Sequence, residues 1–190
     1  MEQENDRPGL DESIGLIEQF MLKSREDFKQ QGFILIFWGV LISVCCVADY
    51  MLMVWFKYSR HYLIWPVLTI SGSIYTMVYY AILRRPAVTG FSDGFLRYLF
   101  GGSAITYFTI AFFCVYNQQP VMPFMLAITG LLVFVTGGTV RFGPLLWGSL
   151  ILEAASISAL FMSHQNQLLV SFIAMVVGYV LPGYLLSKKN

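Results

Sequence analysis

Six long apolar runs, separated by short segments that contain polar, glycine and proline residues, dominate the pattern along the chain. The runs cover residues 33–56, 62–83, 95–116, 121–140, 142–162 and 167–186. A helix needs about 20 apolar residues to cross the hydrocarbon core of a bilayer, where it satisfies its own backbone hydrogen bonds. The pattern therefore predicts an all-α protein, a polytopic membrane bundle of about six transmembrane helices that spans residues 33–187 and has the lipid bilayer as its partner.

The fourth and fifth runs are separated by only a few residues. Glycine, proline and one arginine occur at this point, namely Gly137, Gly138, Arg141, Gly143 and Pro144. Because proline interrupts helices and arginine is costly inside a bilayer, we expect a tight helical hairpin here. A five-span alternative would merge the two runs into one long helix.

An acidic head, residues 1–31, precedes the first run and has a net charge of −4, with eight of the 11 acids of the chain and four basic residues. Apolar positions in the head recur at alternating spacings of four and three, which predicts one amphipathic helix with an apolar seam. The seam comprises Leu10, Ile14, Ile17, Met21, Ser24 and Phe28, and the start suits capping by Asp11 or Ser13. Three uses of residues 10–28 stay open: packing on the membrane surface or beneath the bundle, self-association as a homo-oligomer, and docking of a cytoplasmic protein partner.

Basic residues are distributed unevenly between the two sides of this topology. Ten of them fall on the side that carries both termini and the second and fourth loops, whereas only Lys57 and Arg60 fall on the other. Because loops rich in Lys and Arg remain in the cytoplasm, we expect both termini, including the short tail 188–190, to be cytoplasmic. The expected location is the cell inner membrane.

Composition agrees with a membrane protein. Hydrophobic residues make up 57% of the 190 residues and charged residues 12%, which excludes an ordinary soluble domain. Cys45, Cys46 and Cys114 lie in apolar runs and are odd in number, so they predict neither a disulfide framework nor a zinc-binding spacing.

Glu153 is the first candidate for a functional residue because it lies near the middle of the fifth run, where an ionised side chain is costly unless paired or wetted. Ser149 and Ser156 lie four residues before it and three after it, on one helix face that we expect to point into the bundle. The carboxyl group would either carry a proton or a cation, or join helices by hydrogen bonds.

Two further polar features lie within the runs. Asp49, in the outer third of the first run, is expected to form a local ion pair with Lys57 or Arg60, or to lie along an ion path with Glu153. The second run carries a polar row at spacings of four, three and four, which either lines a hydrated pocket or cross-links helices. The row is Thr69, Ser73, Thr76 and Tyr80.

The histidines and the motif content predict little chemistry. His61 and His164 fall in the two outer loops, where we expect no acid or thiol near them and therefore no metal site. No phosphate-binding loop, metalloprotease motif, serine elbow or paired carboxylate occurs, so we expect no catalytic residue, no cofactor and no nucleic-acid partner. Small residues on the fifth run (Gly148, Ala155, Ala159) and the sixth run (Ser171, Ala174, Gly178) predict close helix packing.

Two segments carry a resemblance. Residues 11–18, leading through Gly32-Phe33 to Phe37-Trp38-Gly39, and residues 180–186 near the end resemble an uncharacterised family of small bacterial membrane proteins of the Bacteroidetes type. The resemblance implies an amphipathic head and about six spans. It implies no activity and no binding residue.

The sequence is compatible with three functions. The first is a membrane-embedded regulatory or scaffold protein whose working surface is the head. The second is a small transporter or channel that uses Glu153, with Asp49 and the polar row along its path. The third is an intramembrane enzyme, for which the sequence contains no motif.

Overall fold

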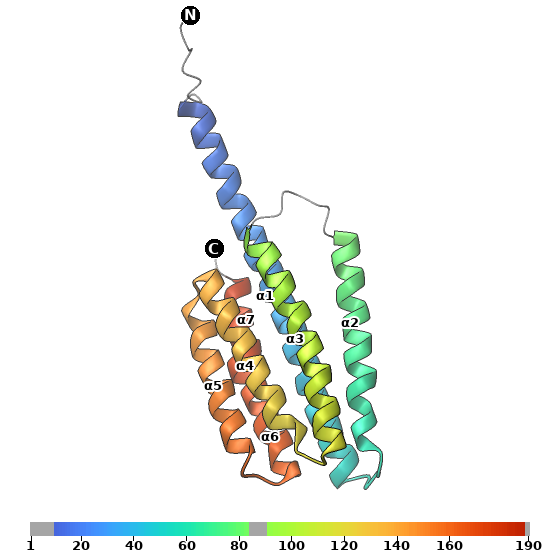
Figure 1. Cartoon of the computed structure of the whole chain (residues 1–190). Coiled ribbons are helices and arrows are strands. Elements are labelled where there is room, and N and C mark those ends of the chain that lie inside the picture. Colours follow the sequence, from blue (N-terminus) through green and yellow to red (C-terminus); the bar gives the residue numbers. More distant parts are fainter. Residues whose placement is uncertain (1–9, 84–90, 189–190) are drawn as a thin grey trace, which may run out of the picture.

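The computed structural model describes residues 10–83 and 91–188, with side chains for residues 32–79, 81–82 and 98–188, and these ranges contain helices and turns but no strand (Figure 1). The α-helices are α1 (Leu10–Val54), α2 (Ile64–Leu83), α3 (Phe91–Tyr116), α4 (Val121–Val140), α5 (Gly143–Ala159), α6 (His164–Met175) and α7 (Leu181–Ser187). A 3₁₀ turn, η1 (His61–Leu63), precedes α2, and a π-helical segment, η2 (Val176–Val180), joins α6 to α7. The predicted all-α class is confirmed.

Five helical segments are long and apolar enough to cross a membrane: Gly32–Val54, His61–Tyr79, Tyr98–Tyr116, Val121–Val140 and His164–Ser187. The sixth, α5, is shorter, with 17 residues, or about 25 Å at ~1.5 Å per residue. It is nevertheless the return path between α4 and α6, so the chain runs along the bundle six times (Figure 1). Apart from α1, which begins at Leu10 and not near residue 33, the helices begin and end within a few residues of the predicted runs.

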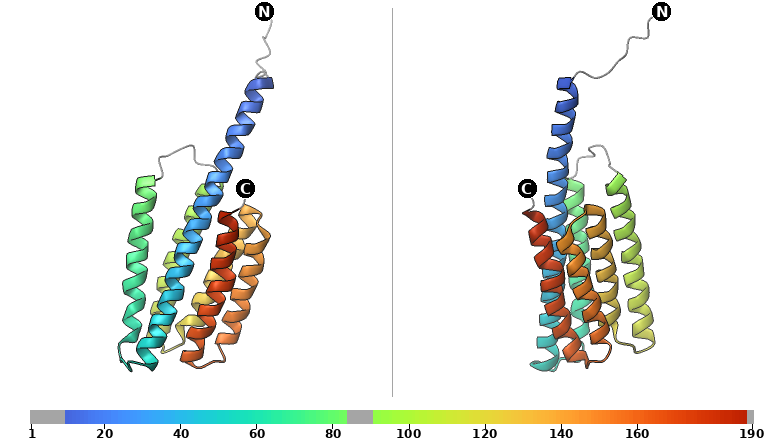
Figure 2. Two further views of the ribbon diagram at one scale, coloured as in Figure 1. Left: turned by 180° about the vertical axis from the view of Figure 1, so that it is seen from behind. Right: turned by 90° about the vertical axis from the view of Figure 1, so that its left-hand side faces the viewer.

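The helix α1 is one unbroken helix of 45 residues that contains both the end of the head and the first apolar run. Its N-terminal part extends beyond the ends of the other helices in all three views, and does not turn back beneath them (Figure 1, Figure 2). Gly32 lies between the two parts, and a Cβ added there would lie 2.7 Å from the backbone nitrogen of Ser187. Gly32 therefore permits close packing of α1 on α7, and one glycine costs a helix only about 1 kcal/mol.

The core lies where α1, α4, α5 and the continuous α6–η2–α7 helix meet. Its fully buried members include Leu145 and Leu152 on α5 and Leu186 on α7. By contrast, α2 packs mainly on α1, and α3 mainly on α4. Only 6% of the apolar window of α2, and 6% of that of α3, is buried, against 50% for α4, so these two helices are peripheral.

The predicted hairpin between the fourth and fifth runs is confirmed. Arg141 adopts the left-handed conformation (φ 51°, ψ 50°), and the amide of Phe142 donates to the carbonyl of Gly137 at 2.9 Å. This is a common way for a helix to end, and it directs the chain into α5, which has Pro144 in its first turn.

Close packing between the fifth and sixth runs is also confirmed. Gly148 on α5 and Gly178 on η2 are both buried and face each other, so a Cβ on either would meet the carbonyl oxygen of the other. Ala159, Ser171 and Ala174 are buried on the same two helices. The small residues thus let two backbones approach, as the pattern predicted.

Candidate functional site

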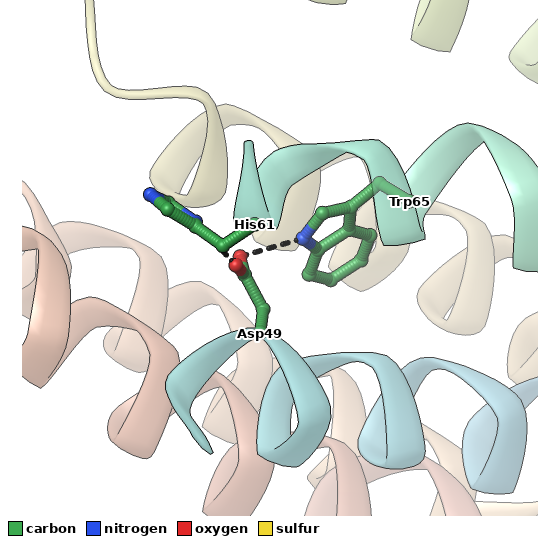
Figure 3. Close-up of polar contacts among 3 residues, drawn as sticks. All are labelled: Asp49, His61 and Trp65. Atoms are coloured by element: carbon green, nitrogen blue, oxygen red, sulfur yellow. Dashed lines mark hydrogen bonds and ion pairs between the residues drawn. The ribbon is translucent and has the colours of Figure 1, made fainter. Parts of the chain in front are cut away.

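A polar cluster lies at the end of the bundle that is remote from the described ends of the chain, where α1 ends and η1 and α6 begin. Its members are Asp49, His61, Trp65 and His164, the first three of which are drawn in Figure 3. They come from three separate segments, so the cluster depends on the tertiary fold.

Local turns bring these segments together. After α1, the amide of Tyr58 donates to the carbonyl of Leu52 at 3.0 Å and Lys57 adopts a positive φ of 49°, which reverses the chain. The chain then forms η1 from His61 and enters α2. On the other side, the Gln167 side chain donates from Nε2 to the carbonyls of Ala159 and Met162, both at 3.1 Å, and so closes the turn between α5 and α6 that carries His164.

Asp49 is the centre of the cluster, and its side chain is only 2% exposed. Its Oδ1 lies 2.5 Å from Nδ1 of His61, and its Oδ2 accepts a hydrogen bond of 2.8 Å from Nε1 of Trp65 (Figure 3). Both carboxylate oxygens are therefore engaged, which is what a buried charge requires. The cluster also joins the start of the peripheral α2 to the core helix α1.

The expected partners of Asp49 were Lys57 or Arg60, and this expectation is wrong within the part of the chain that is described. Both basic side chains are exposed, and no ion pair of theirs occurs among the described residues. A long, strongly hydrated cation loses more solvation than an imidazole or an indole N–H when it enters an apolar site, which favours the partners observed.

His164 completes the cluster. One ligand atom each from Asp49, His61 and His164 lies within 4.8 Å of the other two, and the rings of the two histidines are 6.0 Å apart between centroids. The expectation that the histidines have no acid nearby is therefore wrong. Asp49 lies near His61 because the turn after α1 returns the chain onto its own last turns, and near His164 because α6 packs on α1; sequence separation reveals neither.

Glu153 occupies a different region, on α5 against Gly130 of α4. The side chain is half-buried, and a Cβ added to Gly130 would lie 2.6 Å from its Oε1. Among the described residues, no hydrogen bond or ion pair to this carboxyl group occurs. The predicted contact with a neighbouring helix is present, but the described part of the chain places no polar partner around it.

The two serines that accompany Glu153 are buried and have structural partners. Ser149 donates to the carbonyl of Leu146 on its own helix at 2.7 Å. Ser156 donates to the carbonyl of Pro123 on α4 at 2.8 Å, and so cross-links the two most closely packed helices.

The polar row of the second run does not form a pocket or a cross-link through its described members. Thr69, Ser73 and Thr76 donate to the carbonyls of Trp65, Thr69 and Gly72 of the same helix, at 2.6, 2.8 and 2.9 Å. The Tyr80 side chain lies outside the described residues. A hydroxyl four residues after a carbonyl can satisfy itself locally, and α2 has few neighbours to offer an alternative.

Comparison with protein-family models, with curated proteins and with solved structures finds no match to this chain.

Proposed function

We propose that this chain is a multi-pass protein of the cell inner membrane, with both termini in the cytoplasm. We further propose that it acts as a regulatory or scaffold protein through its α1 extension, residues 10–31. The observation that carries the proposal is the continuity of α1, which is a single helix from Leu10 to Val54 and projects from the bundle (Figure 1). At ~1.5 Å per residue, the extension adds roughly 33 Å to the membrane-length part of the helix.

The arrangement of the helices supports the proposed orientation. The turn at Arg141 and the end of α7 lie at the end of the bundle from which the α1 extension emerges, whereas η1 and the start of α6 lie at the other end (Figure 2). Ten of the 12 Lys and Arg residues of the sequence lie in segments on the same side as both chain termini. Such a bias is characteristic of the cytoplasmic side.

The α1 extension supports assembly of two copies. Its seam positions alternate in steps of four and three from Leu10 to Phe28, which is the a/d repeat of a coiled coil, and all of them except Ser24 are apolar. Because the extension projects beyond the other described helices, no described helix of the same chain lies alongside it there (Figure 2). A second copy, anchored parallel in the same membrane, brings an identical seam to the same height. We therefore assign the seam to a parallel homodimer.

The transporter alternative receives less support. Its path would run through Glu153, Asp49 and the polar row of α2, yet the hydroxyl groups of Thr69, Ser73 and Thr76 bond within their own helix. Asp49, on α1, has its partners on η1 and α2, whereas Glu153, on α5, contacts Gly130 of α4. The enzyme alternative has no catalytic motif in the sequence to support it.

The test compares Ile17→Asp, on the seam, with Gln19→Asp, which introduces the same side chain at a position opposite the seam. The masses of the full chain and of both variants are measured in lipid nanodiscs over a range of protein densities. Burying one isoleucine stabilises by about 1.5–3 kcal/mol, so Ile17→Asp is expected to raise the dissociation midpoint at least about tenfold. Gln19→Asp is expected to leave the midpoint unchanged. A monomeric wild-type protein, or equal effects of both variants, would contradict the proposal.

A further inference from the structure

Both histidines of the chain lie in one cluster with a buried acid. The chain has two histidines in 190 residues, at positions 61 and 164, and the fold brings them together at the end of the bundle. Outside the acidic head there are three acids, Asp49, Asp93 and Glu153, and among the side chains that the structure describes Asp49 lies with both histidines. The three segments involved are the end of α1, η1 and the start of α6.

The donor set is that of a transition-metal site. Two imidazoles and one carboxylate are the protein ligands of many zinc enzymes, which keep a fourth position open, and the same set binds other first-row divalent ions. Magnesium and calcium prefer oxygen ligands only, so this set disfavours them. We propose that Asp49, His61 and His164 bind one divalent transition-metal ion, of which Zn²⁺ is the representative, at the end of the bundle remote from the termini.

The geometry is close to what such an ion needs. Ligand atoms around a tetrahedral Zn²⁺ lie roughly 3.4 Å apart, because each is about 2.0–2.2 Å from the metal. The candidate atoms lie within 4.8 Å of one another, so a pair at that separation has to close by about 1.4 Å, whereas Oδ1 of Asp49 and Nδ1 of His61, 2.5 Å apart, have to separate by about 0.9 Å to admit the ion between them. His164 is exposed, and exposed side chains change rotamer within nanoseconds. The ion takes the place of the hydrogen bond between His61 and Asp49, and His61 binds it through an unprotonated ring nitrogen, so a proton carried by that nitrogen moves to solvent or to the other ring nitrogen.

Trp65 supports the same assignment. It donates to Oδ2 of Asp49 and thereby leaves Oδ1 directed at His61. Hydrogen bonds of this kind hold metal-binding carboxylates in orientation, and their loss typically weakens metal binding about 10- to 100-fold. The burial gradient is also suitable, since Asp49 is buried, His61 intermediate and His164 exposed, which gives an ion a route from the aqueous side.

The competing explanation is a purely structural cluster in which Asp49 holds α2 onto α1. The two explanations differ at His164, for which no hydrogen bond occurs among the described residues and whose side chain is exposed. A structural cluster does not need His164, whereas a metal site does. His164→Gln is therefore the decisive variant, and it is not expected to disturb the fold.

The experiment measures Zn²⁺ binding to the full chain in lipid nanodiscs, by competition with a chromophoric chelator, using an affinity tag without histidine. The wild type is expected to bind one Zn²⁺ per chain. His164→Gln should weaken binding more than about 100-fold, beyond the effect of a supporting residue, and Trp65→Phe about 10- to 100-fold. The matched control is Gln165→Ala, which alters the neighbouring exposed residue and should leave binding unchanged.

Co²⁺ provides a second readout, because its visible absorption reports the nitrogen and oxygen ligands directly. The wild type should give a tetrahedral or five-coordinate Co²⁺ spectrum that His164→Gln abolishes, while the unfolding transition of the variant without metal stays that of the wild type. Absence of saturable Zn²⁺ binding to the folded wild type would overturn the proposal. So would binding that persists in His164→Gln and in Asp49→Asn. Because affinity is measured per chain, the result is independent of whether the α1 extension self-associates.

Discussion

Trp65 shows how a single polar contact holds a peripheral helix to the bundle. Its indole nitrogen donates to Asp49 at 2.8 Å, close to the start of α2. Further along, α2 contacts α1 through stacked rings, Phe37 with Tyr75 at 4.6 Å and Phe33 with Tyr79 at 5.4 Å between centroids. The hydrogen bond is therefore a directional contact that accompanies these apolar ones.

Trp65→Phe keeps an aromatic ring but removes this donor. Because Oδ2 of a buried carboxylate then lacks its partner, we expect a loss of about 1–2 kcal/mol in the free energy of unfolding. The control is Trp147→Phe, since Trp147 is 72% exposed, and it should change stability little. Reversible unfolding in mixed micelles measures both variants. Equal stability of the two would show that the bond to Asp49 contributes nothing.

Gly148 tests the close approach of α5 to η2. A methyl group at this position would meet the carbonyl oxygen of Gly178, which is backbone and has no room to move aside. We expect Gly148→Ala to destabilise the fold by about 1–3 kcal/mol. At Gly101 on α3 nothing lies within 4 Å of an added Cβ, so Gly101→Ala should be neutral or stabilise by up to about 1 kcal/mol. If both substitutions stabilise alike, the glycine contact is not tight.

Sequence patterns predicted these residues unequally well. The small residues near Gly148 and Gly178 were found because close packing leaves a local pattern of small side chains at helical spacing. The cluster of Asp49, His61 and His164 was missed because its members come from separate segments. The one signal in the sequence was their rarity, since these are the two histidines and one of the three acids outside the head. The role of the α2 hydroxyl groups was also missed, since the same spacing serves local bonds and helix contacts.

At the scale of elements, α1 combines two parts that differ in environment. Among the residues whose side chains are described, the core cluster includes Leu35 of α1, and the extension of residues 10–31 precedes it. Each helix satisfies its own backbone, so the extension is not needed to close any hydrogen bond of the bundle.

Deletion of residues 1–30 should therefore leave a bundle that inserts in the membrane and unfolds at the same temperature as the full chain. The same deletion should abolish the proposed dimer. Membrane fractionation, thermal unfolding in detergent and mass in nanodiscs give the three readouts. Failure of the shortened chain to insert would mean that the extension is part of the fold, and a persistent dimer would move the interface into the bundle.

The prediction of elements was most accurate where the hydropathy pattern and the residues at the ends of a run agree. The fourth run and α4 coincide at Val121–Val140, because both ends carry proline, glycine or arginine signals. The head was predicted as a helix, but its continuity with the first span was not predicted. Composition changes at residue 32, and this change suggested a boundary. A single glycine at that point does not break the helix.

At the scale of the whole molecule, four core segments carry most of the buried surface, and α2 and α3 lie at the periphery with large exposed side chains such as Met77, Phe108 and Phe112. This lateral arrangement was beyond sequence reasoning. In a bilayer both the helix-facing and the lipid-facing sides of a span are apolar, so hydropathy does not state which neighbour a helix contacts. The exposed apolar surface is accounted for if lipid covers it, as the proposal requires.

The central claim is that the chain crosses the membrane six times and has both termini in the cytoplasm. Its most direct test is a pair of topology reporters, one that fluoresces only in the cytoplasm and one enzyme that is active only outside it. Each is fused after Asn190, and each is also fused after Ser163, at the start of α6. The account predicts fluorescence without enzyme activity after Asn190, and enzyme activity without fluorescence after Ser163. The opposite pattern, or the same pattern at both positions, would contradict it.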